Sequence, residues 1–171
     1  MKIFGFAGWS GSGKTTLVTK LIPELVGRGV RVSTMKHAHH AFDIDQPGKD
    51  SYEHRAAGAT EVMVGSASRW ALIHEIREDG EPSIDELAGR MTPVDLLLIE
   101  GFKAYPHDKM EVYRADVGKP LICVSEEHIV AVASDGPVPQ ADVPVFDLND
   151  VAAIADFILA RTGLKPARGA A

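Results

Sequence analysis

The chain has 171 residues, of which 45% are hydrophobic and 25% charged, a balance that predicts one globular domain and excludes a disordered chain. It has 18 Lys and Arg residues against 24 Asp and Glu residues, and the net charge of -6 argues against general attraction to nucleic acid or to an anionic membrane. A single cysteine, Cys123, excludes a fold built on disulfides and fits a reducing cytoplasm.

The first 35 residues predict a strand, a loop, a helix and a second strand. Residues 3–7 form an apolar run typical of a strand buried on both faces of a parallel sheet. Residues 14–28 place apolar side chains at helical spacing, and Pro23 is expected to kink this helix. Residues 30–35 predict the next strand, which must run parallel to the first. This order indicates the α/β class, and we expect neither a signal peptide nor a membrane span.

The middle of the chain predicts a long loop, a hairpin and two short helices. Residues 36–49 are polar and too many for an ordinary connection, which favours a binding loop. A helix is expected over residues 50–58, and strands over 60–64 and 69–76 flank a short turn. Ser83 and Glu86 match a capping box, so a further helix should begin there and run to about Met91.

The last third predicts the strongest strand and the end of the fold. Residues 95–101, DLLLIEG, are expected at the centre of the sheet, and residues 121–124, 129–133 and 143–146 predict shorter strands. Asn149 is expected to cap a final helix that Gly163 ends. We therefore predict one nucleotide-binding domain over residues 1–163 and a flexible tail over residues 164–171.

Residues 8–15, GWSGSGKT, match the phosphate-binding loop G-x-x-x-x-G-K-[ST]. Glycines allow the backbone to direct several N–H groups at one anion, and the helix that follows adds its positive end. Lys14 is expected to meet the terminal phosphates, and the Thr15 hydroxyl is a ligand for Mg²⁺. The predicted phosphate-binding residues are Gly8, Ser10, Gly11, Ser12, Gly13, Lys14, Thr15 and Thr16.

Glu100 follows the apolar run of residues 96–99. Parallel strands present their ligands at their carboxyl ends, so Glu100 is predicted to lie beside the phosphate-binding loop and to hold Mg²⁺ or its water. It is also the candidate catalytic residue. The alternative is that Glu100 only ends a strand in solvent.

The polar loop includes His37, His39, His40, Asp43 and Asp45. Neither helical nor strand spacing would bring three of these side chains to one ion, which argues against a transition-metal site. A Mg²⁺ ligand from Asp43 or Asp45 is favoured instead. Five residues are candidates for a second anion site or a pterin site, and each is as readily an ordinary surface charge: Lys36, His37, Lys49, Arg55 and Lys103.

Three segments resemble the molybdopterin-guanine dinucleotide biosynthesis protein B (MobB) family: GWSGSGKTTL at the start, KHAHHAFDIDQPGKDSYEHRAAGA at 36–59 and LLLIEGFK at 96–103. The resemblance implies a P-loop NTPase-type three-layer fold of the dethiobiotin-synthetase-like group, with an additional β-hairpin. It implies a homodimeric accessory protein that binds GTP and Mg²⁺ and assists the guanylyltransferase that joins GMP to molybdopterin. It also implies that Asp45 and Glu100 lie near Mg²⁺ and that residues 101–103, including Lys103, line the same cleft.

The sequence departs from the patterns of related proteins at two places, one that concerns dimerisation and one that concerns recognition of the nucleotide base. Trp9 stands where relatives that dimerise around ATP carry a second lysine, so we do not expect a lysine that crosses into the partner subunit. The guanine signature N-K-x-D or T-K-x-D is missing, and Asp135 is the best substitute because a carboxylate accepts both a ring N–H and an amino group. A plain turn aspartate before Gly136 is equally consistent with the sequence.

Three functions compete at this point. An accessory protein with weak GTPase activity fits best, because no arginine finger and no residue that positions water are evident. An autonomous small-molecule kinase or ligase would need an Arg-bearing lid, and no Arg-rich segment follows residues 95–101. A signalling switch would need a loop that senses the γ-phosphate, a role that residues 36–50 are placed to fill.

Overall fold

A computed structural model describes residues 1–38, 42–77, 80–102 and 105–166. The chain divides into two compact units, one of residues Met1–His37 with Pro93–Ala171 and one of residues Ala38–Thr92. The assignment of residues 1–163 to a single domain stays a prediction, and most of the expected tail lies outside the described residues. Within the described residues, no helix has the length and apolar character that crossing a membrane requires.

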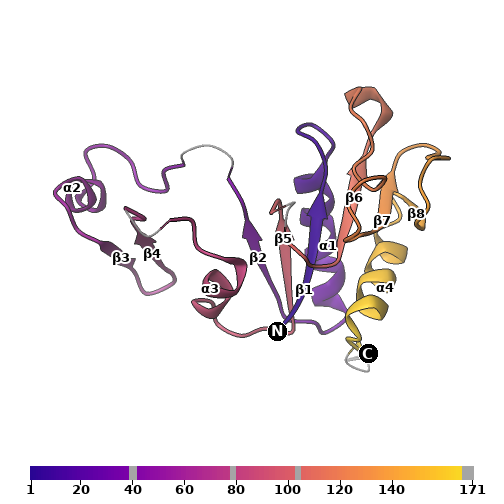
Figure 1. Ribbon diagram of the computed structural model, residues 1–171. Helices are drawn as coiled ribbons and strands as arrows, with labels where there is room; N and C mark the ends of the chain where they lie inside the picture. The colour runs from indigo at the N-terminus through magenta and orange to yellow at the C-terminus, as the bar shows by residue number, and fades with distance from the viewer. Residues whose placement is uncertain (39–41, 78–79, 103–104, 167–171) are drawn as a thin grey trace. The chain divides into compact units, whose positions relative to one another are not determined.

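The first unit is built on a six-stranded sheet in which all neighbouring strands are parallel. This confirms the predicted α/β class with a mostly parallel sheet. β5 lies one strand from the edge and not at the centre as predicted, because an unpredicted strand, β6, adds to the other side of β1. In sheet order the strands are β2 (Val32–Lys36), β5 (Leu96–Glu100), β1 (Lys2–Ala7), β6 (Lys109–Tyr113), β7 (Ile129–Ser134) and β8 (Val145–Asp147) (Figure 1).

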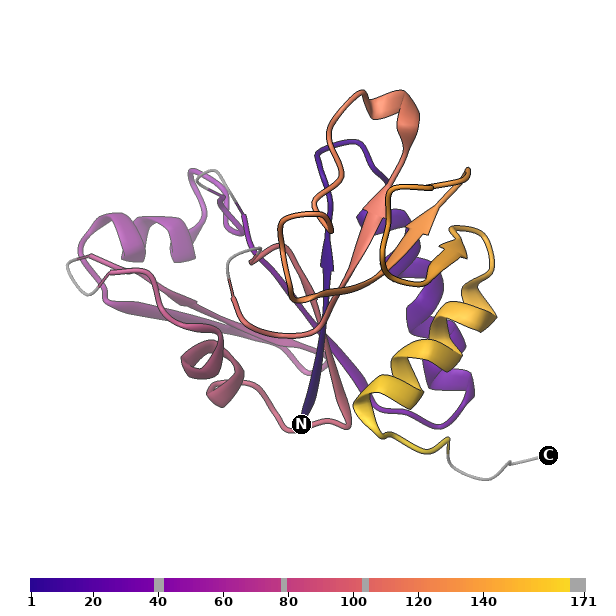
Figure 2. The same cartoon turned by 45° about the vertical axis from the view of Figure 1, so that its right-hand side comes forward.

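Two helices, α1 (Lys14–Gly27) and α4 (Val151–Thr162), pack side by side on one face of this sheet (Figure 2). α1 continues through Pro23. α4 begins at Asp150, whose side chain accepts a hydrogen bond from Ala153 N, so the prediction that Asn149 caps this helix is wrong. Gly163 ends α4 in the left-handed conformation, as predicted. The core against these helices consists of alternate strand residues, among them Phe4, Phe6, Leu96, Leu98, Met110 and Val112.

β6 escaped sequence analysis because two of its five residues, Lys109 and Glu111, are charged and yet fully buried. Lys109 Nζ donates to the carbonyl oxygens of Tyr105 and His107, at 2.5 and 3.1 Å. The Glu111 carboxylate accepts from the backbone N–H groups of residues 122 and 123 at 2.8 to 3.0 Å. These bonds hold residues 122–125 in a turn, so the strand predicted over 121–124 is wrong.

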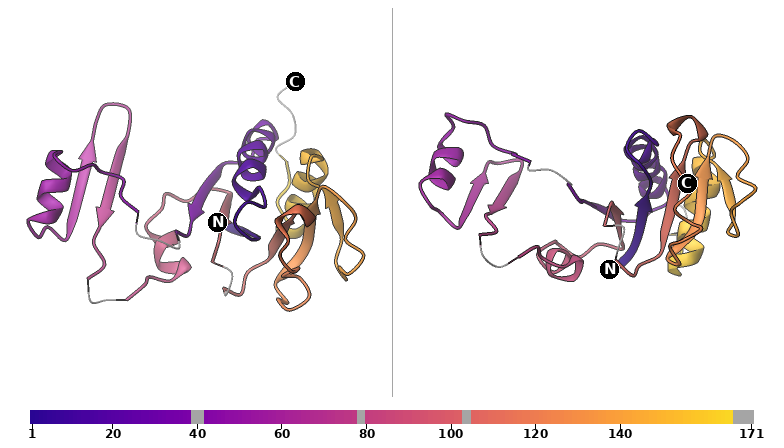
Figure 3. Two further views of the ribbon diagram at one scale, coloured as in Figure 1. Left: turned by 90° about the horizontal axis from the view of Figure 1, so that it is seen from above. Right: turned by 45° about the horizontal axis from the view of Figure 1, so that its top comes forward.

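The second unit contains α2 (Asp50–Ala56), β3 (Glu61–Gly65), β4 (Trp70–His74) and α3 (Ile84–Gly89). β3 and β4 pair antiparallel, which confirms the predicted hairpin, and α2 packs next to β3 (Figure 3). The capping box is also confirmed: Ser83 Oγ accepts from Glu86 N at 3.2 Å, and the Glu86 carboxylate accepts from Ser83 N at 2.8 Å.

The side chains of His107 and Lys109 lie against Gly5, and neither ring nitrogen of His107 has a hydrogen-bond partner among the described residues. Burial, together with the nearby charge of Lys109, lowers the pKa of His107 to about 4. Between about pH 6.5 and pH 4 the unfolded chain therefore binds a proton that the folded chain does not, so stability falls as the pH falls through this range.

We expect His107→Leu to recover about 1–2 kcal/mol of the stability that the protein loses between pH 7 and pH 4.5, a value discounted for partial solvent access. Urea denaturation at several pH values measures it. His54→Gln, at an exposed position on α2, is the control and should keep the original pH slope. If the free energy of unfolding of His107→Leu falls with pH as steeply as that of the original chain, the His107 ring is not the cause of the loss of stability in acid.

Candidate functional site

The loop between β1 and α1 has the backbone that anion binding requires. Gly8, Gly11 and Gly13 all have positive φ, at 145°, 83° and 95°. Gly13 is the N-cap of α1 and makes no side-chain cap, and the first turn of this helix carries no acidic residue. The positive end of α1 is therefore available to an anion.

Lys14 lies across the same loop. Its Nζ donates to the carbonyl oxygens of Gly8 at 2.9 Å and Trp9 at 3.0 Å, and Ser12 N donates to the Trp9 carbonyl at 3.2 Å. The loop is thus closed by its own hydrogen bonds around an ammonium group. This arrangement presents one positive charge together with backbone N–H groups, which suits a phosphate chain.

Thr15, Glu100 and Lys36 meet at one side of the loop. Thr15 Oγ1 lies 2.9 and 3.0 Å from the two carboxylate oxygens of Glu100, and Lys36 Nζ lies 3.7 Å from the same carboxylate. A hydroxyl beside a carboxylate is a donor set that fits Mg²⁺. The three residues line an open pocket of about 400 Å³ together with Ser10, Gly11, Gly13, Lys14 and Thr16.

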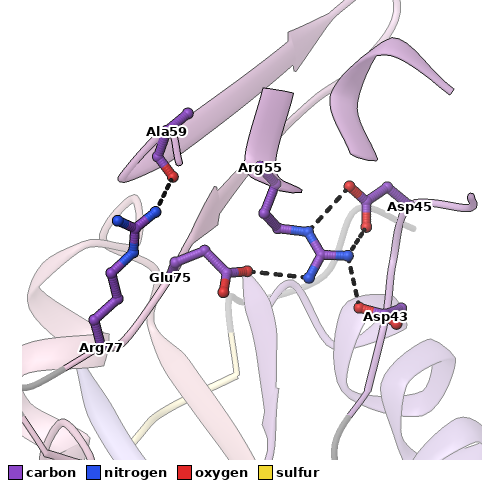
Figure 4. A network of polar contacts seen from close by, with 6 residues as sticks. All are labelled: Asp43, Asp45, Arg55, Ala59, Glu75 and Arg77. Atoms are coloured by element: carbon purple, nitrogen blue, oxygen red, sulfur yellow. Dashed lines mark hydrogen bonds and ion pairs between the residues drawn. The ribbon is translucent and has the colours of Figure 1, made fainter. Parts of the chain in front are cut away.

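Asp45 and Arg55 lie in the second unit, where Arg55 binds three carboxylates (Figure 4). Its guanidinium lies 2.9 Å from Asp43, 2.9 Å from Asp45 and 3.2 Å from Glu75, and these bonds raise the pKa of Arg55. Asp45 is only 5% exposed. Its role as a Mg²⁺ ligand stays a prediction, as does anion binding by Arg55, and either role requires this network to open.

The remaining candidates are spread over the chain. The His37 ring stacks on Phe102 with ring centroids 4.4 Å apart, and His37 N donates to the Glu100 carbonyl. Lys49 precedes α2 in the second unit. Lys103, His39 and His40 lie outside the described residues. Within the described residues, no group of three or more His, Cys, Asp or Glu side chains is arranged to hold a metal ion.

Arg114 is the residue at this site that sequence analysis missed. It follows β6, and its guanidinium donates to the Ser12 carbonyl at 3.2 Å and to Asp135 at 2.9 Å. The expectation that carboxyl ends of parallel strands carry ligands would have identified it, had β6 been predicted. Arg114 lines a second, smaller hollow with Gly13, Thr16, Leu17, Lys20, Leu148 and Asn149.

Trp9 joins the loop to a neighbouring segment. Its indole Nε1 donates to the Pro120 carbonyl at 2.8 Å, and Lys119 Nζ lies 5.9 Å from the centre of its ring. In this chain the position therefore serves to hold the loop against residues 119–120.

Comparison with known proteins gives consistent matches. Residues 3–135 match the family model MobB, described as molybdopterin guanine dinucleotide synthesis protein B. A molybdopterin-guanine dinucleotide biosynthesis adapter protein of Escherichia coli K12 is 47% identical over 92% of this chain and 91% of its own length. The protein of the same name from Haemophilus influenzae is 42% identical over 91% of this chain and 86% of its own.

Solved structures agree with these matches. A crystal structure of molybdopterin-guanine biosynthesis protein B superposes with a TM-score of 0.71 at 28% identity, covering 93% of this chain and 99% of that one. The crystal structure of Bacillus subtilis MobB gives a TM-score of 0.70 at 26% identity, covering 98% of this chain and all of the other. The fold described above is therefore also found in these structures.

The loop geometry predicts unequal costs for two alanine substitutions. A Cβ at Gly8 would lie 2.5 Å from the Val112 carbonyl oxygen and 2.7 Å from Ser12 Oγ, whereas a Cβ at Gly11 meets nothing within 4 Å. Gly11→Ala should cost about 1–2 kcal/mol, the strain of a positive φ alone. Gly8→Ala should cost at least about 2 kcal/mol more, because a backbone carbonyl must move. Urea denaturation measures both, and equal losses would contradict this account of the loop.

Proposed function

This chain belongs to the molybdopterin guanine dinucleotide synthesis protein B (MobB) family, and from that premise we propose that it is a GTP-binding adapter in the synthesis of molybdopterin guanine dinucleotide. In this role it assists a guanylyltransferase that attaches GMP to molybdopterin. Two relatives that it matches over nine-tenths of its length are named as adapter proteins of this synthesis.

The observation that carries the nucleotide part of this proposal is the contact between Thr15 and Glu100. It brings an oxygen pair to the phosphate-binding loop, within the same pocket as Lys14. A bound Mg²⁺ would neutralise phosphate charge, and the Thr15 hydroxyl and the Glu100 carboxylate are the groups that would hold it or its water. The ammonium group of Lys36, 3.7 Å from the carboxylate, partly balances the negative charge of Glu100.

Lys14→Ala should abolish the binding of GTP in the presence of Mg²⁺ without unfolding the protein, since the Lys14 ammonium lies against the loop and its side chain is not part of the core. Titration calorimetry of folded protein measures it. Lys2→Ala, at an exposed position at the opposite end of β1, should bind as the original chain does. If folded Lys14→Ala binds GTP with unchanged affinity, the assignment of residues 8–16 as the phosphate site is wrong.

Hydrolysis of GTP by the isolated chain should be far slower than the roughly 1–100 s⁻¹ of committed kinases. The described residues that line the Thr15–Glu100 pocket supply lysines but no arginine, and an arginine finger contributes about 10³–10⁵ in rate. Phosphate release is measured with the chain alone and with the purified guanylyltransferase, for the original chain and for Glu100→Gln, which should lower it. Turnover in the kinase range by the chain alone, on any small acceptor, would favour an autonomous kinase or ligase instead.

The hairpin supports a homodimer as part of the same proposal. Met63, Leu72 and Trp70 lie on one face of β3 and β4 and are 65%, 37% and 65% exposed. A two-stranded hairpin with such an apolar face is stabilised when another surface covers it.

If a second copy covers this face, Trp70→Lys should convert the dimer to monomer in sedimentation velocity. Val26→Lys, which replaces an apolar side chain on α1 that is 54% exposed, should leave the dimer intact. A dimer that survives Trp70→Lys places the interface elsewhere, and a monomer for the original chain overturns the dimer.

A further inference from the structure

The two hollows beside the phosphate-binding loop differ in chemistry. The first contains Lys14, Thr15 and Glu100 and suits phosphates and Mg²⁺. The second shares Gly13 and Thr16 with it but is lined by Arg114, which follows β6, and by Leu148 and Asn149, which follow β8. Since β1, β6, β7 and β8 are successive parallel neighbours, their carboxyl ends form one edge, and the second hollow continues along that edge from the loop.

Arg114 joins the loop to Asp135, the first residue after β7. Its Nε donates to the Ser12 carbonyl and its Nη1 donates to Asp135 Oδ2, at 3.2 and 2.9 Å. The other carboxylate oxygen of Asp135 accepts no hydrogen bond from the described residues. One guanidinium therefore bridges this carboxylate and the backbone of the loop.

Stability does not account for this arrangement. The side chains of Arg114 and Asp135 are 40% and 36% exposed, and ion pairs of that exposure contribute little to folding. Asp135 would otherwise be a turn aspartate with several open rotamers. A carboxylate bridged to a phosphate-binding loop in this way is well placed to accept the ring N–H and the amino group that distinguish guanine from adenine.

We propose that Arg114 is a positioning residue for base recognition: it holds Asp135 at a set distance from the phosphate-binding loop, so that a guanine nucleotide is preferred over an adenine nucleotide. The inference rests on the proposed nucleotide binding and adds to it the residue on which the choice of base depends. It also predicts that the effects of Arg114 and Asp135 are not independent, because one acts through the other.

The experiment measures dissociation constants by titration calorimetry for GTP, ATP and inorganic triphosphate, each with Mg²⁺. Arg114→Ala and Asp135→Ala should each weaken the binding of GTP about tenfold or more, as expected for a lost hydrogen bond to a charged group. Each should also bring the ratio of the dissociation constants for ATP and GTP toward one. Inorganic triphosphate should bind within about twofold of the original affinity. The double variant should lose no more affinity for GTP than either single variant.

Arg161→Ala is the matched control, since Arg161 is similarly exposed, at 49%, and pairs with Asp108 away from the loop. It should change none of the three constants. Arg114→Lys keeps the charge but not the fork that bonds two partners, so it should restore the preference for GTP only in part.

Several results would overturn the inference. One is an unchanged GTP to ATP ratio in Arg114→Ala, and another is an equal loss for inorganic triphosphate, which would make Arg114 a phosphate ligand. A third is additive losses in the double variant. Equal affinity of the original chain for GTP and ATP would overturn it while leaving nucleotide binding intact, whereas no binding of any of the three probes would remove the proposed nucleotide site itself.

Discussion

The backbone of Gly8 passes so close to the Val112 carbonyl oxygen that no side chain fits between them, and this contact sets where the phosphate-binding loop begins. β1 lies between β5 and β6, so the loop emerges between Glu100 at the end of one neighbour and Arg114 just after the other. Residues distant in sequence thereby converge on one anion-binding backbone. A glycine loop alone would lack the carboxylate of Glu100 and the guanidinium of Arg114 beside it.

Two buried charged residues hold β6 in its place. Lys109 and Glu111 are both fully buried, and an unpaired charge in such a position would be strongly destabilising. Each instead bonds to backbone groups, Lys109 to the carbonyls of residues 105 and 107 and Glu111 to the N–H groups of residues 122 and 123. The segments that contain residues 105–107 and 122–123 are thus tied to β6, the strand that Arg114 follows.

Charge is arranged differently in the two units. Around the loop, Glu100 is only 14% exposed and is held between the Thr15 hydroxyl and the Lys36 ammonium, so its orientation is set in advance. In the second unit, one guanidinium, that of Arg55, is shared among three carboxylates. Asp43 and Asp45 of the long polar loop are therefore engaged by a cation of their own unit.

Sequence alone determined the local features. The spacing of residues 8–15 specified a glycine-rich loop before a helix, the apolar run before Glu100 specified a strand with a carboxylate at its end, and Ser83 and Glu86 specified a helix start. Each feature depends on residues only a few positions apart, where the order and spacing of the side chains determine the backbone conformation directly. Tertiary structure decided the rest. β6 was hidden because the backbone groups that satisfy its buried charges lie in the segments on either side of the strand, outside any periodic pattern. Ser12, Arg114 and Asp135 are brought together by strand order, which no local pattern encodes.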